Sequence, residues 1–300
     1  MRLKNVLKYA VQCVGLCLLF SSLSAQAELS VVDDSGKTVS LKTPAKRVIS
    51  LAPHVTEMIF AAGGGKQLVG VVSYSDFPEE AKKIQNVGDN RQWDMERIIA
   101  LKPDLLVVWQ HGNSERQIDG LRKLGVPLFY SEPKKLDDIA ESVQKLGVLM
   151  GTEVVAQASA KKYHEQLDQL RARYAQRPVV RMFYQVWDKP LFTLNGKHIV
   201  SDAMKLCGGE NIFAPLPITA PNVSVEAVIK ENPEAIFSGD RSNQSGAGLG
   251  LWKNYTSILA VQRGNLFSLD GDLLSRSGPR MIAGAALICE KLDQVRQKRK

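Results

Sequence analysis

Two glutamates, Glu96 and Glu226, open two copies of one short sequence pattern. Residues 96–107 (ERIIALKPDLLV) and 226–237 (EAVIKENPEAIF) share a proline seven positions after the glutamate, then an acidic residue and an apolar run. A surface carboxylate can pair with a cationic group of a partner, although the helix dipole alone also favours an acid in the first turn. The copies lie about 130 residues apart, too far for a solenoid. We therefore expect two similar α/β lobes with one glutamate each.

Strands alternate with helices in both halves of the chain. This order predicts two Rossmann-like lobes, each with a mainly parallel sheet flanked by helices. Residues 153–176 carry apolar side chains at spacings of three and four and contain no glycine or proline, which predicts one long, rigid helix. We therefore divide the chain into an N-terminal lobe (28–151), a connecting helix (152–177) and a C-terminal lobe (178–300). In the first lobe, Thr56 is expected to cap the helix after Pro53.

The N-terminus has the pattern of a secretory signal peptide. Three basic residues precede an apolar stretch over residues 9–20, and an A-x-A site follows before Glu28. Cleavage at residue 27 would remove three basic residues and no acidic residue, which lowers the formal net charge from +8 to +5. We expect an exported chain that is not embedded in a membrane, with residues 296–300 as a solvated basic tail. No pattern typical of nucleic-acid binding is present in the sequence.

Two cysteines, Cys207 and Cys289, remain after the signal peptide. An even number in an oxidising compartment permits a disulfide that ties the final helix to the second lobe. Two buried free thiols are the alternative.

Motifs for catalysis are missing from the sequence. It contains no G-x-S-x-G, H-E-x-x-H, P-loop or C-x-x-C pattern, and its histidines, aspartates and glutamates show no metal-site spacing. We therefore expect a binding protein and not an enzyme.

Five segments carry a resemblance to a known family. They are residues 47–53 (RVISLAP), 73–78 (SYSDFP), 96–104 (ERIIALKPD), 112–117 (GNSERQ) and 207–213 (CGGENIF). With these segments the chain resembles the periplasmic cobalamin-binding proteins, the substrate-binding components of bacterial vitamin B12 ABC importers. The resemblance implies a class III periplasmic binding protein fold, in which one long helix joins two lobes and the ligand lies between them. It also implies a monomer in the periplasm.

Aromatic residues are the first candidates for ligand contact. Trp109 ends a predicted parallel strand, where open α/β sheets bind ligands, and it matches a ligand-facing tryptophan of the family. Tyr74 lies at a position that the family uses for contact, and its alternative is a half-buried loop residue. The resemblance places a family tryptophan at Asn90, so Trp93, three residues on, is either a substitute or a core residue.

The second lobe matches the family less closely. Asp272 and Arg276 fit a ligand-contact segment, with polar contacts to corrin amides as the implied role. Ala220 stands where the family has a stacking tryptophan, and Trp187, after the first strand of this lobe, is the candidate replacement.

Two further expectations concern metal and partner. His111 follows Trp109 and is either solvated or an axial ligand to cobalt or haem iron, so a haem or ferric-siderophore binder of the same fold is the alternative function. The resemblance also implies that Glu96 and Glu226 meet arginines of an inner-membrane permease dimer.

Overall fold

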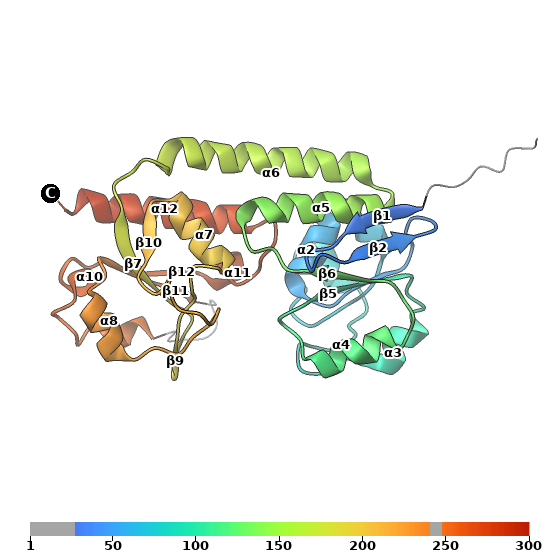
Figure 1. Ribbon diagram of the computed structural model, residues 1–300, viewed down its shortest axis with the longest axis horizontal. Coiled ribbons are helices and arrows are strands. Elements are labelled where there is room, and N and C mark those ends of the chain that lie inside the picture. The colour runs from blue at the N-terminus through green and yellow to red at the C-terminus, as the bar shows by residue number, and fades with distance from the viewer. Residues whose placement is uncertain (1–27, 241–247, 300) are drawn as a thin grey trace, which may run out of the picture.

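The computed structural model describes residues 28–240 and 248–299. The predicted signal peptide, residues 241–247 and Lys300 lie outside these ranges. Figure 1 shows two α/β lobes lying side by side, with helix α6 (Glu153–Tyr174) running along both. Within the described ranges, no helix has both the length and the apolar character needed to cross a bilayer.

The first lobe contains a four-stranded parallel sheet. Its order is β4-β3-β5-β6, and a separate antiparallel hairpin, β1–β2, lies at its side. The strands of a parallel sheet that is covered on both faces must be almost wholly apolar. The central strands β3 and β5 are short apolar runs of this kind, and they are buried. The elements are β1 (Leu29–Val32), β2 (Thr38–Leu41), β3 (Val48–Ser50), α2 (Pro53–Ala61), β4 (Leu68–Val71), α3 (Met95–Ala100), β5 (Leu105–Trp109), α4 (Glu115–Arg122), β6 (Leu128–Ser131) and α5 (Leu136–Met150).

The second lobe repeats this topology. Its sheet has the order β10-β7-β11-β12, so in both lobes the first strand of the sheet lies between the second and the third. The elements are β7 (Val180–Gln185), β8 (Trp187–Asp188), β9 (Leu191–Phe192), α7 (Ile199–Leu206), β10 (Gly209–Asn211), α8 (Val225–Glu231), β11 (Ala235–Asp240), α9 (Leu249–Trp252), α10 (Leu259–Gln262), β12 (Leu266–Asp270), α11 (Gly271–Leu274) and α12 (Met281–Gln297). The two-lobed parallel fold predicted from the sequence is confirmed.

The repeated sequence pattern has the same structural role in each lobe. It forms a short helix followed by the third strand of the sheet, as α3 and β5 or as α8 and β11. The residue after the proline makes the same backbone hydrogen bond in both lobes. The backbone N–H of Asp104 donates to the carbonyl of Arg47, and that of Glu234 donates to the carbonyl of Arg181. Each of these bonds ties the repeat to the start of the first strand of its sheet.

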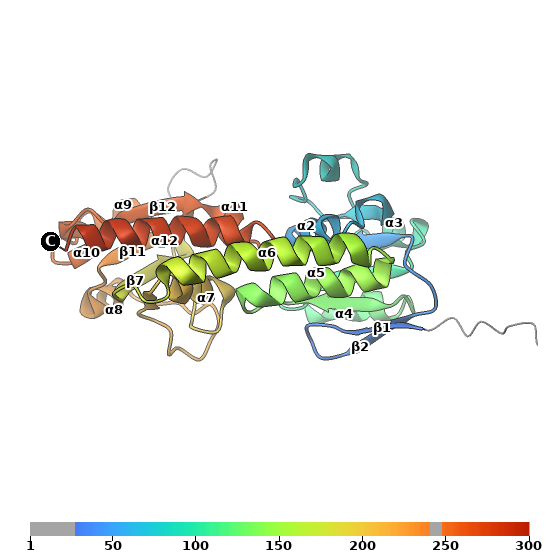
Figure 2. The same cartoon turned by 90° about the horizontal axis from the view of Figure 1, so that it is seen from above.

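Helix α6 joins the lobes along one face, where it lies beside α5 and α12 (Figure 2). Its buried side chains form one stripe: Ala156, Ala160, Tyr163, Leu167 and Tyr174. Helix α6 packs closely against α5, a helix that was not predicted from the sequence. A Cβ at Gly147 of α5 would lie 2.3 Å from the Cβ of Ala156, so only glycine permits this approach.

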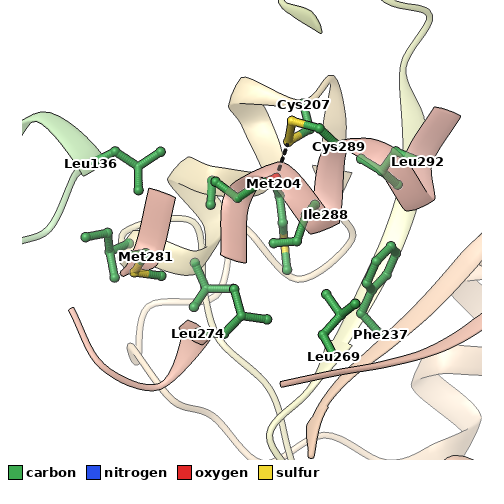
Figure 3. Close-up of a cluster of buried hydrophobic side chains, with 14 of the residues drawn as sticks. Leu136, Met204, Cys207, Phe237, Leu269, Leu274, Met281, Ile288, Cys289 and Leu292 are labelled. Atoms are coloured by element: carbon green, nitrogen blue, oxygen red, sulfur yellow. Dashed lines mark hydrogen bonds between the residues drawn. A yellow bond between two sulfur atoms is a disulfide. The ribbon is translucent and has the colours of Figure 1, made fainter. Parts of the chain in front are cut away.

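A disulfide joins Cys207 to Cys289, as predicted, with an S–S length of 2.05 Å. It links the end of α7 to α12 inside the hydrophobic core of the second lobe, where Met204, Ile288 and Leu292 surround it (Figure 3). The bridge closes a loop of 82 residues and anchors the final helix to the body of the lobe.

The expectation of a solvated C-terminal tail was wrong for Arg296 and Arg299, and Lys300 lies outside the described ranges. The Arg296 guanidinium donates to the carbonyls of Cys207 (2.6 Å) and Pro178 (2.8 Å). Arg299 donates to both carboxylate oxygens of Glu234, at 2.7 and 2.6 Å. The basic residues therefore fasten the end of α12 to the lobe, and charge alone could not reveal this because the acceptors are distant in sequence.

Candidate functional site

In the described part of the chain, Trp109 lines two cavities that lie between the lobes. The smaller cavity has a volume of about 170 Å³. It is lined mainly by residues of the first lobe, and the loop after α11 contributes the second lobe's part of the wall. The larger, about 320 Å³, has residues of both lobes on its walls. The smaller cavity is lined by Leu51, Ala52, Pro53, His54, Val72, Ser73, Tyr74, Asn90, Trp109, Asn113, Ser275 and Arg276. The larger is lined by Trp109, His111, Glu132, Pro133, Lys134, Lys197, His198, Ile199, Thr219 and Ser277. We call the two together the cleft.

The topology explains why these residues meet. Ala52, Ser73, His111 and Glu132 follow the carboxyl ends of β3, β4, β5 and β6, and these ends share one edge of the parallel sheet. Ligands of open α/β sheets bind at this edge. In the second lobe, the loop after β12 and α11 brings Ser275 and Arg276 to face it.

Arg276 is the centre of an ion cluster between the lobes, in which Arg276 and Glu57 are buried and Asp76 and Asp272 are partly exposed. Its guanidinium Nη1 lies 2.6 Å from Asp76 Oδ1 and 3.3 Å from Glu57 Oε1, and its Nη2 lies 3.3 Å from Asp272 Oδ1. Glu57 and Asp76 belong to the first lobe, so this cluster joins the lobes directly. Asp272 and Arg276 were predicted from the sequence as site residues, whereas Glu57 and Asp76 were not. Glu57 could have been identified as a candidate from the sequence, because it is the one acidic residue in the largely apolar helix α2.

A second arginine strengthens the same contact. Arg280 donates to both carboxylate oxygens of Glu57, at 2.7 and 3.0 Å, and its guanidinium lies 4.3 Å from the ring centroid of Phe77. Burial alone would raise the pKa of Asp76, but the hydrogen bond and the charge of Arg276 outweigh it and hold that pKa below its ordinary value. Asp76 is therefore an anion at neutral pH, as its pairing requires.

Tyr74 lies at the mouth of the smaller cavity in an unusual conformation. Its φ is +67° and its side chain is 66 % exposed. A positive φ is uncommon for an aromatic residue and is found where the surroundings impose it. Here Ser75 is fixed by Thr56, whose buried Oγ1 also bonds Ser50. Thr56 thus anchors this loop, and the prediction that it caps α2 was wrong, since Ala52 is at that position.

The other two candidate tryptophans do not line the cleft. Trp93 is only 5 % exposed and packs in the core of the first lobe. Trp187 is 49 % exposed on β8, directly after the central strand β7, and its Nε1–H donates to the carbonyl of Lys189 at 3.0 Å.

His111 lies on the wall of the larger cavity and is paired with an acid. Its Nδ1 lies 3.1 Å from Glu132 Oε2, which also accepts from the backbone N–H of His111, and its side chain is 67 % exposed. Across residues 28–240 and 248–299, no three or more His, Cys, Asp or Glu side chains are grouped to hold a metal ion.

Glu96 and Glu226 occupy matching places outside the cleft. Each is the second residue of a short helix, and the preceding cap side chain, of Asp94 or Ser224, accepts a backbone N–H of the first turn. Both glutamates are exposed, and both helices lie on the side of the lobes opposite α6 (Figure 1). The backbone N–H of Glu226 and the Ser224 hydroxyl hold the pKa of the Glu226 carboxyl below its ordinary value.

Comparison with known proteins places this architecture among transport-associated binders. Residues 48–273 match the family model described as periplasmic binding protein. A vitamin B12-binding protein of Vibrio parahaemolyticus is 36 % identical over 287 residues, which cover 96 % of this chain and 98 % of the relative. The crystal structure of the periplasmic vitamin B12 binding protein BtuF of Vibrio cholerae matches with a TM-score of 0.78 at 37 % identity, over 84 % of this chain and 98 % of that one. The haem-binding protein RhuT of Roseiflexus shares the fold, with a TM-score of 0.73 at 24 % identity over 84 % and 99 % of the two chains.

Proposed function

The chain belongs to the periplasmic binding protein family, and we propose that it captures cobalamin between its lobes and delivers it to an inner-membrane ABC importer. It acts as a binding protein and not as an enzyme. Relatives that are 36 % and 38 % identical over 96 % and 83 % of the chain are vitamin B12-binding proteins, which supports this choice of ligand.

One observation carries the proposal, namely the position of Trp109 at the junction of both cavities of the cleft. A corrin has broad apolar faces and a rim of amides, so its site needs aromatic walls and a few polar groups. Trp109 and the exposed ring of Tyr74 provide apolar contact, and Arg276 provides a donor on the opposite wall. In our proposal Asp272 orients Arg276, and Trp187, which is exposed at the end of β7 outside the present cavities, covers the ligand once the lobes have separated to admit it. Trp93 packs the core behind the site.

The present cleft is smaller than such a ligand. Drug-sized ligands occupy pockets of about 300–1,000 Å³, so cobalamin requires the lobes to separate beyond the cavities described here. The continuous helix α6 crosses from one lobe to the other without a glycine or proline, which favours a small change of angle over a wide hinge motion.

Delivery rests on the two exposed glutamates. Glu96 and Glu226 lie one on each lobe, so a permease dimer with two suitably spaced arginines would engage both only at a certain lobe separation. Two linked weak contacts bind more strongly than either alone. Because docking depends on the distance between the two glutamates, the permease would distinguish the protein whose lobes are held apart by ligand from the protein without ligand.

The ligand assignment is tested by titrating the mature chain with cyanocobalamin and, separately, with haem. We expect saturable quenching of tryptophan fluorescence by cyanocobalamin at micromolar concentration or below, because Trp109 lines the site. We expect haem to give no saturable Soret shift. Saturation by haem alone, with the shift lost in His111→Ala, would replace cobalamin with haem as the ligand.

A further inference from the structure

The larger cavity of the cleft has a basic wall that the proposed aromatic contacts do not use. Lys134 lines this cavity from the first lobe and Lys197 lines it from the second. Neither ammonium group belongs to an ion pair within the described ranges. Glu132 is the one acid among the lining residues, and it is paired with His111, whose Nδ1 lies 3.1 Å away. The cavity therefore keeps positive charge that no acid among the described residues pairs with.

His198, which follows Lys197 in the chain, presents a hydrogen-bond donor to the same cavity. Its Nδ1 accepts the backbone N–H of Val200 at 3.2 Å, where His198 caps helix α7. Burial lowers the pKa of His198 to about 4, so the ring is neutral at neutral pH. A neutral imidazole carries one proton, and a backbone N–H can only donate. The proton of His198 is therefore on Nε2, at the distal end of the ring, and this N–H donates to no residue that the structure describes.

The turn that begins α7 holds these two side chains next to each other. Asn195 Oδ1 accepts the backbone N–H of Lys197 at 3.0 Å, and the carbonyl of Asn195 accepts from the Ser201 hydroxyl at 2.8 Å. The Asn195 side chain is itself fixed, because its Nδ2–H donates to the carbonyl of Leu216 at 2.9 Å. Adjacent Cα atoms lie about 3.8 Å apart, so Lys197 and His198 can reach one bound group. Both residues belong to the second lobe, so their spacing does not depend on the separation of the lobes.

We propose that Lys197 and His198 form a subsite for the phosphodiester of cobalamin, the anionic group in the loop that joins the benzimidazole base to the corrin. One phosphate oxygen accepts from His198 Nε2–H, and the Lys197 ammonium pairs with the phosphate charge. Lys134 adds positive charge from the facing wall. Hydrogen bonds to an ionised group are about twice as strong as those between neutral groups, so this pair suits an anion better than a further amide of the rim. The inference rests on the proposed function, because it assigns one part of the same ligand to the same cleft.

Such a subsite distinguishes complete cobalamin from corrinoids that lack the nucleotide loop. In the proposed function both kinds of ligand present the same corrin and amides to Trp109 and Arg276. Only a ligand with the phosphate offers an anion to Lys197 and His198. Losing one hydrogen bond to a charged group weakens binding by about tenfold or more.

Three ligands separate the phosphate from the rest of the nucleotide loop. Cyanocobalamin carries the phosphate and the base, cobinamide phosphate carries the phosphate without the base, and dicyanocobinamide carries neither. Lys197→Met removes the charge and Lys197→Arg keeps it. In His198→Asn the side chain can still cap α7 but is too short to place a donor where Nε2 lies. Lys205→Met is the matched control, because Lys205 is an exposed lysine near the other end of α7 and does not line the cavity.

The measurement is the dissociation constant of each ligand for each form of the protein. We expect Lys197→Met and His198→Asn to weaken the binding of cyanocobalamin and of cobinamide phosphate by about tenfold. Binding of dicyanocobinamide should not change, which also shows that the variants are folded. Lys197→Arg and Lys205→Met should bind all three ligands like the wild type.

Each other result would contradict the subsite. Equal weakening of all three ligands, or no weakening of any, would overturn the inference and leave the proposed function intact. Weakening of cyanocobalamin alone would assign the two residues to the base instead of the phosphate, and would overturn it as well. If the wild type bound none of the three corrinoids, the proposed function would fail and the subsite with it.

Discussion

Replacing Glu57 with glutamine is expected to lower the free energy of unfolding by about 3 kcal/mol. Glu57 is almost fully buried between Arg276 and Arg280 and is the one acid that pairs with both of them in the described structure. Removing one partner of a buried ion pair leaves an uncompensated charge away from water, which costs about 3–5 kcal/mol. We take the lower end because Arg276 keeps Asp76 and Asp272.

Chemical denaturation of the mature protein measures this effect, and Glu79→Gln is the matched control. Glu79 also pairs with a basic residue, Lys82 at 2.7 Å, but both side chains are exposed, so its removal should change stability little. If Glu57→Gln were no more destabilising than Glu79→Gln, the ion cluster would contribute nothing to holding the lobes together.

Reversing both charges, Glu96→Arg with Glu226→Arg, is expected to abolish delivery to the permease. Each reversal replaces an attraction by a repulsion, and like charges brought together across an interface cost several kcal/mol. Because the two contacts act together, either single reversal should reduce delivery partially and the double reversal by more than about a hundredfold. The measurement is cobalamin-stimulated ATP hydrolysis by the permease in proteoliposomes.

The control for this experiment reverses two exposed acids on the other side of the lobes. Glu141→Arg on α5 and Glu290→Arg on α12 also change one exposed charge in each lobe, but these two helices lie beside α6 (Figure 2). This variant should stimulate the permease normally. Both double variants should bind cobalamin like the wild type. A loss of ligand affinity in the Glu96/Glu226 variant would mean that these residues do more than dock.

The sequence predicted the local elements well because their signals are local. The repeat at Glu96 and Glu226, the apolar face of α6 and the pairing of Cys207 with Cys289 all appear in the structure. The repeat and the helix face depend on periodicity, which can be read within a short window, and the disulfide follows from the count of two cysteines after the signal peptide.

The centre of the site could not be predicted in the same way. The cluster of Glu57, Asp76 and Arg276 joins residues about 200 positions apart, and nothing near Glu57 in the sequence identifies its partners. For Trp93 the sequence left ligand contact and core packing open, because an aromatic residue near a family contact position is equally suited to both, and the structure places it in the core. The basic C-terminal residues were misjudged because their acceptors are backbone carbonyls and an acid far along the chain.

The central claim is that one cobalamin is held between the two lobes, and hydrogen exchange of the mature protein with and without saturating cyanocobalamin tests it most directly. We expect slower exchange in both walls of the cleft, at residues 52–58 and 107–111 of the first lobe and at residues 197–200 and 275–281 of the second. Exchange in residues 290–297 of α12, remote from the cleft, should not change. Protection confined to one lobe, or absent from both at saturation, would contradict the account.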